Sequence, residues 1–269
     1  MTTKTASTKR AIIFLSTHIL FTFALAVVFL PSAWAGEDLS TLRSKAEAGD
    51  ATAQYNLGLL YEKGQGLPQD VVKATHWFRL AAKQGNAQAQ DILGACYSIG
   101  LGVPQDVVKA AHWWGLAAKQ GVPRDQANLG YLYANGRGGM PQDFAKAAYW
   151  YRLAAKQGNA RAQAVLGLLY ATGQGVPQDV VKAAHWWGLA ARQGYTEARY
   201  NLGRLYANGG PGVPQNYSKA AYWYRLAARQ GYAAAQYYLG MLYENGQGVA
   251  QDKAKARYWL RLAAQNKHH

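Results

Sequence analysis

The chain contains the stretch Asp179-Val-Val-Lys-Ala-Ala-His-Trp-Trp-Gly-Leu-Ala-Ala-Arg-Gln-Gly194. Fifteen of these sixteen residues recur at 106–121. Less similar copies lie at 70–85, 143–158, 216–231 and 252–266, so the chain contains six copies of one unit. A glycine recurs every 36 or 37 residues along these copies, at Gly49, Gly85, Gly121, Gly158, Gly194 and Gly231. A period of this length predicts stacked supersecondary units, each of which contacts only its neighbours.

The first 35 residues have the pattern of a secretory signal peptide. Three basic residues precede an apolar run at 11–30, and Ala33 and Ala35 form an A-x-A site that predicts cleavage before Gly36. The apolar run is long enough to span a bilayer if it is not cut, which is the alternative interpretation. We therefore expect a periplasmic or secreted protein that has no membrane span once the leader is removed.

The chain is strongly basic. Its 29 Lys and Arg residues against 14 Asp and Glu give a formal charge of +15, which becomes +12 without the predicted leader. Such an excess indicates an anionic partner, and for an exported protein nucleic acid is the least available one. Cys96 is the only cysteine, so no internal disulfide can form and the stacking of the units must hold the fold together.

Each unit predicts two helices. In the first unit, apolar spacing predicts a helix over 51–63, with Asp50 as its N-cap and Gly64 and Pro68 ending it. A second helix should start after Asp70 and stop at Gly85. A shorter helix within 36–49 is expected to cap the amino-terminal end of the stack.

One tryptophan recurs at the same position of every second helix. The six copies are Trp77, Trp113, Trp150, Trp186, Trp223 and Trp259. Projection at 100 degrees per residue places this position on the alanine-rich arc of the helix. We interpret the six tryptophans as core residues that fill the space between units, and not as a ligand platform.

The unit A-x-x-x-L-G-x-L-Y-x-x-G-x-G-V-P-Q-D-x-x-K-A-x-x-W-x-x-L-A-A-x-Q-G resembles the Sel-1-like repeat, a relative of the tetratricopeptide repeat. It is seen most clearly in the segments 166–170 and 173–179 and in Lys182 and Trp186. The resemblance implies an all-α fold, a right-handed α-solenoid of helix pairs whose first helices line a concave face. It also implies an adaptor or scaffold protein, of the exported bacterial type.

The six units lie at about 50–85, 86–121, 122–158, 159–194, 195–231 and 232–266, followed by a tail at 267–269. Units two and three recur as units four and five at an offset of 73 residues, which suggests the duplication of a pair. Some cysteine-rich members of the family have penicillin-binding or β-lactamase activity. This chain lacks those cysteines, so we do not expect that activity.

No pattern in the sequence favours catalysis, a cofactor or a metal. His76, His112 and His185 have no recurrent Ser or Asp within helical reach, and a stack of units would hold them apart, whereas metal ligands must converge. The Gly-x-Gly loops join two helices, so they do not have the strand and helix of a phosphate-binding loop. The recurrent aspartates are spread one to a unit as helix caps and offer no acid and base pair.

The predicted binding residues are variable positions of the first helices. If these helices face the concavity, the residues expected to bind a partner are Tyr55, Leu59, Tyr131, Tyr200, Arg204, Tyr237 and Met241. Tyrosine and arginine are enriched in the residues that dominate the energy of protein interfaces. We therefore expect a protein or peptide partner, in the envelope or on a host; free drift at exposed positions is the alternative.

Two columns of basic residues run along the second helices. The first is Lys73, Lys109, Lys146, Lys182, Lys219 and Lys255, and the second is Lys83, Lys119, Lys156, Arg192 and Arg229. Cations near the carboxyl end of a helix also complement its dipole, so the second column has a purely structural explanation. The alternative function is a stripe that binds an envelope polymer or another anionic surface.

Overall fold

The computed structural model describes residues 38–137 and 139–266. The predicted signal peptide at 1–35 and the tail at 267–269 lie outside these residues. The described residues divide into two units at residue 44, and α2 (Leu39–Glu47) spans the boundary. A helix is therefore present where the amino-terminal cap was predicted, and its role as a cap stays a prediction.

After α2, the described residues form twelve helices in six pairs. We refer to α3, α5, α7, α9, α11 and α13 as the A helices and to α4, α6, α8, α10, α12 and α14 as the B helices. The A helices are α3 (Ala51–Lys63), α5 (Ala87–Ile99), α7 (Pro123–Asn135), α9 (Ala160–Thr172), α11 (Thr196–Asn208) and α13 (Ala233–Asn245). The B helices are α4 (Val71–Lys83), α6 (Val107–Lys119), α8 (Phe144–Lys156), α10 (Val180–Arg192), α12 (Tyr217–Ala228) and α14 (Lys253–Asn266).

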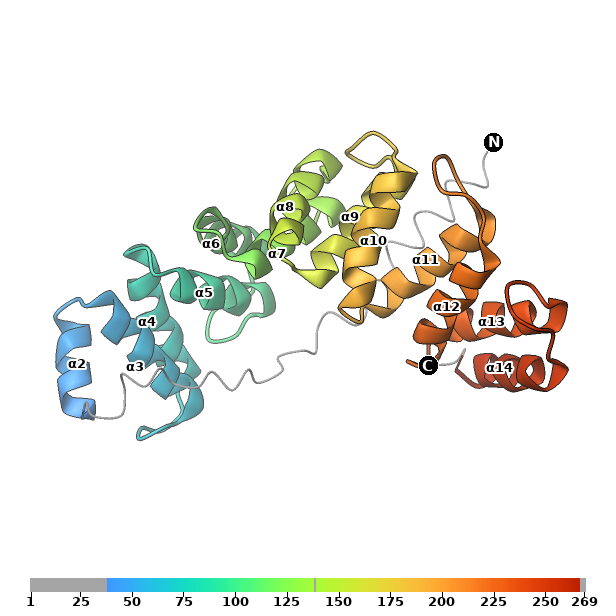
Figure 1. Ribbon diagram of the computed structural model, residues 1–269. Helices are drawn as coiled ribbons and strands as arrows, with labels where there is room; N and C mark the ends of the chain where they lie inside the picture. Colours follow the sequence, from blue (N-terminus) through green and yellow to red (C-terminus); the bar gives the residue numbers. More distant parts are fainter. Residues whose placement is uncertain (1–37, 138, 267–269) are drawn as a thin grey trace. The chain divides into compact units, whose positions relative to one another are not determined.

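Each A helix packs on the B helix that follows it, and each B helix packs on the next A helix, so the pairs follow one another in chain order (Figure 1). The described residues contain no β-strand, only an isolated bridge between Gly210 and Val213. The predicted all-α fold of six helix pairs is confirmed.

Local signals set the ends of the helices. The Asp50 carboxylate accepts a hydrogen bond of 2.7 Å from the amide of Ala53, and equivalent side chains cap the start of every B helix. The A helix of the first unit ends at Gly64, which is left-handed with φ +68°. Gly85 (φ +91°) has the same role after α4, where the Asn86 amide donates back to the Ala81 carbonyl. The period of glycines is thus a period of helix ends.

In the core of each pair, a glycine of one helix packs against a large side chain of the other. The glycine lies in the A helix, at Gly58, Gly94, Gly130, Gly167, Gly203 and Gly240. The side chain that covers it comes from the B helix of the same pair: Phe78, Trp114, Tyr151, Trp187, Tyr224 and Leu260. A methyl group on Gly94 would lie 2.4 Å from the Trp114 ring, so only glycine allows this approach.

The recurring tryptophans therefore do not occupy the position that was predicted for them. All six are only partly buried, whereas the residue that follows each of the first five is 1–9% exposed. Successive residues differ by a rotation of about 100° around the helix axis. The residue after each tryptophan therefore faces the A helix, and the tryptophan lies at the edge of the interface. Trp113, Trp186 and Trp259 still pack against core residues from that edge.

A ladder of buried glutamines joins consecutive pairs. The Gln90 amide group donates to the Ala82 carbonyl of the preceding B helix at 3.0 Å, and its oxygen accepts from Gln120 at 2.8 Å. The same arrangement recurs at Gln126, Gln163 and Gln236. Gln54 makes the equivalent contacts, but the carbonyl that accepts from it is that of Ala46 on α2. In the fifth pair Arg199 donates to the Ala191 carbonyl instead. These glutamines were not among the residues predicted to hold the units together.

Candidate functional site

The seven predicted binding residues differ in exposure. Arg204 and Tyr237 are exposed, and Tyr55, Tyr131, Tyr200 and Met241 are partly buried. Leu59 is only 3% exposed and packs in a cluster with Ala74 and Phe78. Leu59 is therefore not available to bind a partner as predicted, because the B helix of its own pair covers it.

The structure brings Tyr200 and Tyr237 into one aromatic group, which we call the tyrosine cluster: Tyr200, Tyr224, Tyr232, Tyr237 and Tyr238. The Tyr200 ring on α11 lies 6.0 Å from Tyr224, 5.0 Å from Tyr232 and 6.2 Å from Tyr238, measured between ring centroids. Tyr238 stacks on Tyr224 at 5.5 Å, and Tyr237 meets Tyr238 edge to face at 5.4 Å. The cluster thus joins α11 and α13, two consecutive A helices, through α12.

The tyrosine cluster has a buried base and an exposed top. Tyr224 is 1% exposed, whereas Tyr237 and Tyr238 are 48% and 41% exposed. Burial raises the pKa of Tyr200 and raises the pKa of Tyr232 to about 12, so both phenols are neutral near pH 7. The surface therefore offers fixed rings and hydroxyl groups without negative charge.

Arg204 adds one cation beside the tyrosine cluster. It lies four residues after Tyr200 on α11, which is one helical turn. Burial raises the pKa of Tyr200, Tyr224 and Tyr232, and the charge of Arg204 lowers each of them by a smaller amount. Arg204 is exposed and makes no ion pair with any carboxylate in the described part of the chain. A ligand carboxylate could therefore reach it.

Tyr131 and Tyr55 lie elsewhere on the A helices, each near an arginine. The guanidinium groups of Arg137 and Arg161 lie 5.6 and 5.4 Å from the centroid of the Tyr131 ring, which are distances for cation–π contacts. The charge of Arg124 acts on Tyr55 and lowers its pKa, although burial raises that pKa more. Arg124 itself forms an ion pair with the nearly buried Asp91, which links α7 to α5.

The net charge is divided unequally between the two sets of helices. The B helices contain sixteen Lys and Arg residues and no Asp or Glu. The A helices contain five basic and five acidic residues, so their formal charges cancel. The positive excess of the described chain therefore belongs to the B helices.

The first basic column is largely neutralised by its own helix caps. Five of its six lysines form ion pairs of 2.9–3.3 Å with the capping aspartate three residues earlier. In the fifth pair the cap is Asn216, and Lys219 has no carboxylate there. Each of the six lysines also lies 5.2–5.6 Å above a tyrosine ring of the preceding A helix.

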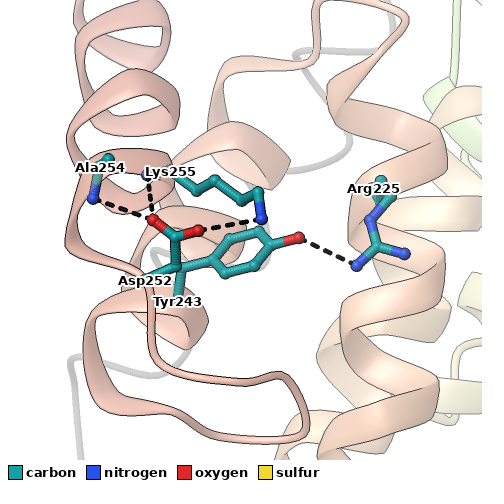
Figure 2. Close-up of polar contacts among 5 residues, drawn as sticks. All are labelled: Arg225, Tyr243, Asp252, Ala254 and Lys255. Atoms are coloured by element: carbon teal, nitrogen blue, oxygen red, sulfur yellow. Dashed lines mark hydrogen bonds and ion pairs between the residues drawn. The ribbon is translucent and has the colours of Figure 1, made fainter.

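Figure 2 shows this arrangement in the last pair. Asp252 accepts hydrogen bonds from the amides of Ala254 and Lys255. It also forms an ion pair of 2.9 Å with the Lys255 ammonium group. The Tyr243 hydroxyl accepts a 3.1 Å hydrogen bond from Arg225 on the preceding B helix. The equivalent arginines Arg79 and Arg152 make the same type of contact, at 3.5 and 3.4 Å. The lysines of the first column therefore contact their own helix pair, whereas these three arginines join one pair to the next.

The second basic column is free of such contacts. Lys83, Lys119, Lys156, Arg192 and Arg229 are all exposed. None of them forms an ion pair with a described carboxylate. These are the cations that an anionic partner could contact.

Asp125 is a buried carboxylate that the sequence analysis missed. It is 0% exposed, and neither of its oxygens has a hydrogen-bond partner in the structure. Burial raises its pKa to about 7. Aligned units could have shown it, because the equivalent position in each of the other five is a buried alanine: Ala53, Ala89, Ala162, Ala198 and Ala235.

The remaining reactive groups do not converge. The described residues hold no group of three or more His, Cys, Asp or Glu side chains that could bind a metal ion. Cys96 is buried, and burial raises the pKa of its thiol to about 12, so it is a poor nucleophile. No helix between residues 38 and 266, where the structure is described, is long and apolar enough to cross a membrane.

Comparison with known proteins gives consistent matches over the six helix pairs. The Sel1 repeat family model matches residues 51–86, 87–122, 123–159, 160–195, 196–232 and 233–268. Among solved structures, c5321, titled a protective antigen present in uropathogenic Escherichia coli strains displaying an SLR fold, is 40% identical with a TM-score of 0.78. A Sel1 repeat protein from Oxalobacter formigenes is 35% identical with a TM-score of 0.66.

These matches differ in how much of each protein they cover. The match to c5321 covers 86% of this chain and 49% of c5321, and the match to the Oxalobacter protein covers 80% and 85%. A segment of 63 residues is 40% identical to the secretory immunoglobulin A-binding protein EsiB of Escherichia coli O6:H1 (strain CFT073), and it covers 23% of this chain and 13% of EsiB. The chain thus spans about half the length of c5321.

Proposed function

Because the chain belongs to the Sel1 repeat family, whose members are typically scaffolds for protein interaction, we propose that it binds a protein or peptide partner on its A helices and catalyses no reaction. The fold is an α-solenoid of six such repeats. The observation that carries the proposal is the tyrosine cluster, with Arg204 beside it.

The chemistry of the tyrosine cluster suits a protein partner. Tyrosine and arginine are the side chains that most often dominate binding energy at interfaces. Rings that already pack on one another lose little conformational freedom when a partner covers them. The A helices also carry no net formal charge, which favours a partner recognised by shape and hydrogen bonds.

The other predicted residues extend this surface. Tyr55, Tyr131 and Met241 are partly buried on A helices and are proposed as peripheral contacts, whereas Leu59 is not proposed. The concave groove that the family implies would place all of them on one side.

We further propose that the partner is met outside the cytoplasm, in the envelope or on a host. The motif at 1–35 supports export. The name of EsiB, a relative that binds secretory immunoglobulin A, supports a protein as the type of partner. No sequence pattern or described group supports the β-lactamase activity of cysteine-rich family members.

The test is a binding experiment with matched variants. The mature chain is used to capture proteins from envelope and mucosal extracts, the captured protein is identified and purified, and its Kd is measured by calorimetry. We expect Arg204→Ala, Tyr237→Ala and Tyr238→Ala together to weaken binding by about 100-fold or more, since hot spots cost about 2 kcal/mol each.

The control variant is Tyr149→Ala with Tyr222→Ala, two tyrosines that are each 53% exposed but lie on B helices. It should bind the partner within about twofold of the wild type. Equal affinity of the wild type and the A-helix variant would refute the proposed site.

A further inference from the structure

An unbroken series of exposed rings lies on the B helices, one to a repeat. We call it the ring row: His76, His112, Tyr149, His185, Tyr222 and Tyr258. Every other position of the described chain that recurs in all six repeats with an aromatic ring is at least partly buried. The ring row is therefore the aromatic position that every repeat leaves exposed.

Each ring of the ring row is held by the tryptophan that follows it. The two rings meet edge to face, with centroids 4.9–5.5 Å apart and planes inclined by 76–81°. The tryptophans are partly buried at the edge of the core. An exposed ring that already rests on an indole needs little ordering when a ligand stacks on it.

A free cation accompanies five of the six rings. We call these the cation row: Lys83, Lys119, Lys156, Arg192 and Arg229, each seven residues after a ring. Residues at i and i+7 lie on the same stripe of a helix, about 10 Å apart along its axis. The cation row is exposed and makes no ion pair with any carboxylate between residues 38 and 266, as far as the structure describes them.

The charge of the B helices selects an anionic ligand. These helices contain no acidic residue, and the capping aspartates neutralise the first lysine column but not the cation row. A cation in five successive repeats, with no acid on the same helices, attracts a polyanion more strongly than a single charge would.

We propose that the ring row and the cation row together bind a linear acidic polysaccharide. The apolar C–H face of a sugar ring packs against an aromatic ring, while its carboxylate or sulfate groups pair with lysine and arginine. A ligand with a repeating ring and a repeating anion matches a surface that repeats the same two features. This site uses other helices than the protein-binding surface, so either proposal can fail without the other.

Two other anionic ligands have part of this chemistry. A single-stranded nucleic acid stacks its bases on aromatic rings and pairs its phosphates with cations. An anionic membrane attracts the same cations and accepts aromatic side chains at its interface. The binding experiment therefore compares all three ligands.

The probes are alginate, a linear polyuronate, with neutral dextran, a thirty-residue oligothymidylate and vesicles of mixed phosphatidylglycerol and phosphatidylcholine as comparisons. Affinity is measured by biolayer interferometry at several salt concentrations. We expect alginate to bind more tightly than the other three probes, with an affinity that falls as salt rises.

Two triple variants test the two rows separately. The first combines Tyr149→Ala, Tyr222→Ala and Tyr258→Ala and removes half of the ring row. The second combines Lys83→Gln, Lys119→Gln and Lys156→Gln and removes most of the cation row. Each triple variant should weaken alginate binding by at least tenfold, and the glutamine variant should also reduce its salt dependence. The control, Arg204→Ala with Tyr237→Ala on the A helices, should bind alginate within twofold of the wild type.

All six ring and cation substitutions are at exposed positions, and circular dichroism should show an unchanged helix content and melting temperature. The proposal is overturned if alginate does not bind, if dextran binds equally well, or if the oligothymidylate or the vesicles bind more tightly. Unchanged binding by the tyrosine variant would also overturn it, because charge alone would then explain the affinity.

Discussion

Asp125 departs from the repeat at a position where every other unit has alanine. It lies in the first turn of α7, next to Arg124, whose charge lowers its pKa while the larger effect of burial raises it to about 7. An unpaired buried carboxylate is costly in its charged form. The native chain therefore holds the Asp125 proton more tightly than the unfolded chain, whose ordinary value is 3.8.

This shift predicts that stability falls as pH rises. The contribution of the protonated carboxyl is fully present below pH 3.8 and is lost as pH rises through about 7, by about 4 kcal/mol for a shift of this size. We expect Asp125→Ala to remove this loss, so that its advantage over the wild type grows by a few kcal/mol between pH 4 and pH 8. Urea denaturation at a series of pH values measures it.

Asp125→Asn is the matched control for charge. It keeps the buried polar group but cannot ionise, so it should remove the pH dependence without the full stabilisation that alanine gives. If the wild type and both variants lose stability in parallel from pH 4 to pH 8, Asp125 is not the group that titrates.

At the scale of elements, each repeat depends on the approach of its two helices at one glycine. The A helix has Gly94 where the Trp114 ring of α6 crosses it, and the indole nitrogen of Trp114 donates to the Asp91 carbonyl at 3.2 Å. Trp187 makes the equivalent contact with the Ala164 carbonyl at 3.1 Å. A side chain on the glycine would separate the helices and break this hydrogen bond.

Gly94→Ala should therefore destabilise the protein. The new methyl group would lie 2.4 Å from the Trp114 ring, and overpacking of this kind typically costs about 1–3 kcal/mol. The change is measured by thermal and urea denaturation, together with tryptophan fluorescence.

Gly115→Ala is the matched control, because it changes another helical glycine in the same repeat. A methyl group there meets no atom within 4 Å, and alanine is the better helix former by about 1 kcal/mol. It should leave the stability unchanged or increase it. An equal loss for both variants would show that the contact with Trp114 has no special role.

At the scale of the whole molecule, repeats contact only their neighbours, so a pair of repeats can be removed if the new junction reproduces an existing one. Deletion of 122–194 would join Gly121 to Tyr195. The sixteen residues before this junction would differ from those of the native junction only by Lys119 in place of Arg192.

The four-repeat chain should therefore fold, with the same helix content per residue and a lower melting temperature, because fewer interfaces remain. It keeps the tyrosine cluster and Arg204, so protein binding should be retained. It loses Tyr149 and His185 from the ring row, so alginate binding should weaken. Circular dichroism and the two binding assays measure these outcomes.

Deletion of 159–194 alone is the control for the junction. It would place α8, with Tyr151 in the core position, before α11, a helix that normally follows Trp187. This non-native interface should lower the stability by more than the loss of one repeat alone would. If the longer deletion failed to fold while this one folded, the repeats would not be independent in the way that the contacts indicate.

The sequence by itself determined the number of repeats and the ends of their helices. Asp50 and Gly64 bound α3 where they were predicted to, because caps and left-handed glycines act over a few residues and need no distant partner. The tertiary structure alone decided which aromatic residue is buried. Trp113 and Trp114 differ by one step of helical rotation, and only the second of them is buried against the A helix. Such differences depend on the orientation of each helix against its neighbours, which a periodic sequence repeats without specifying.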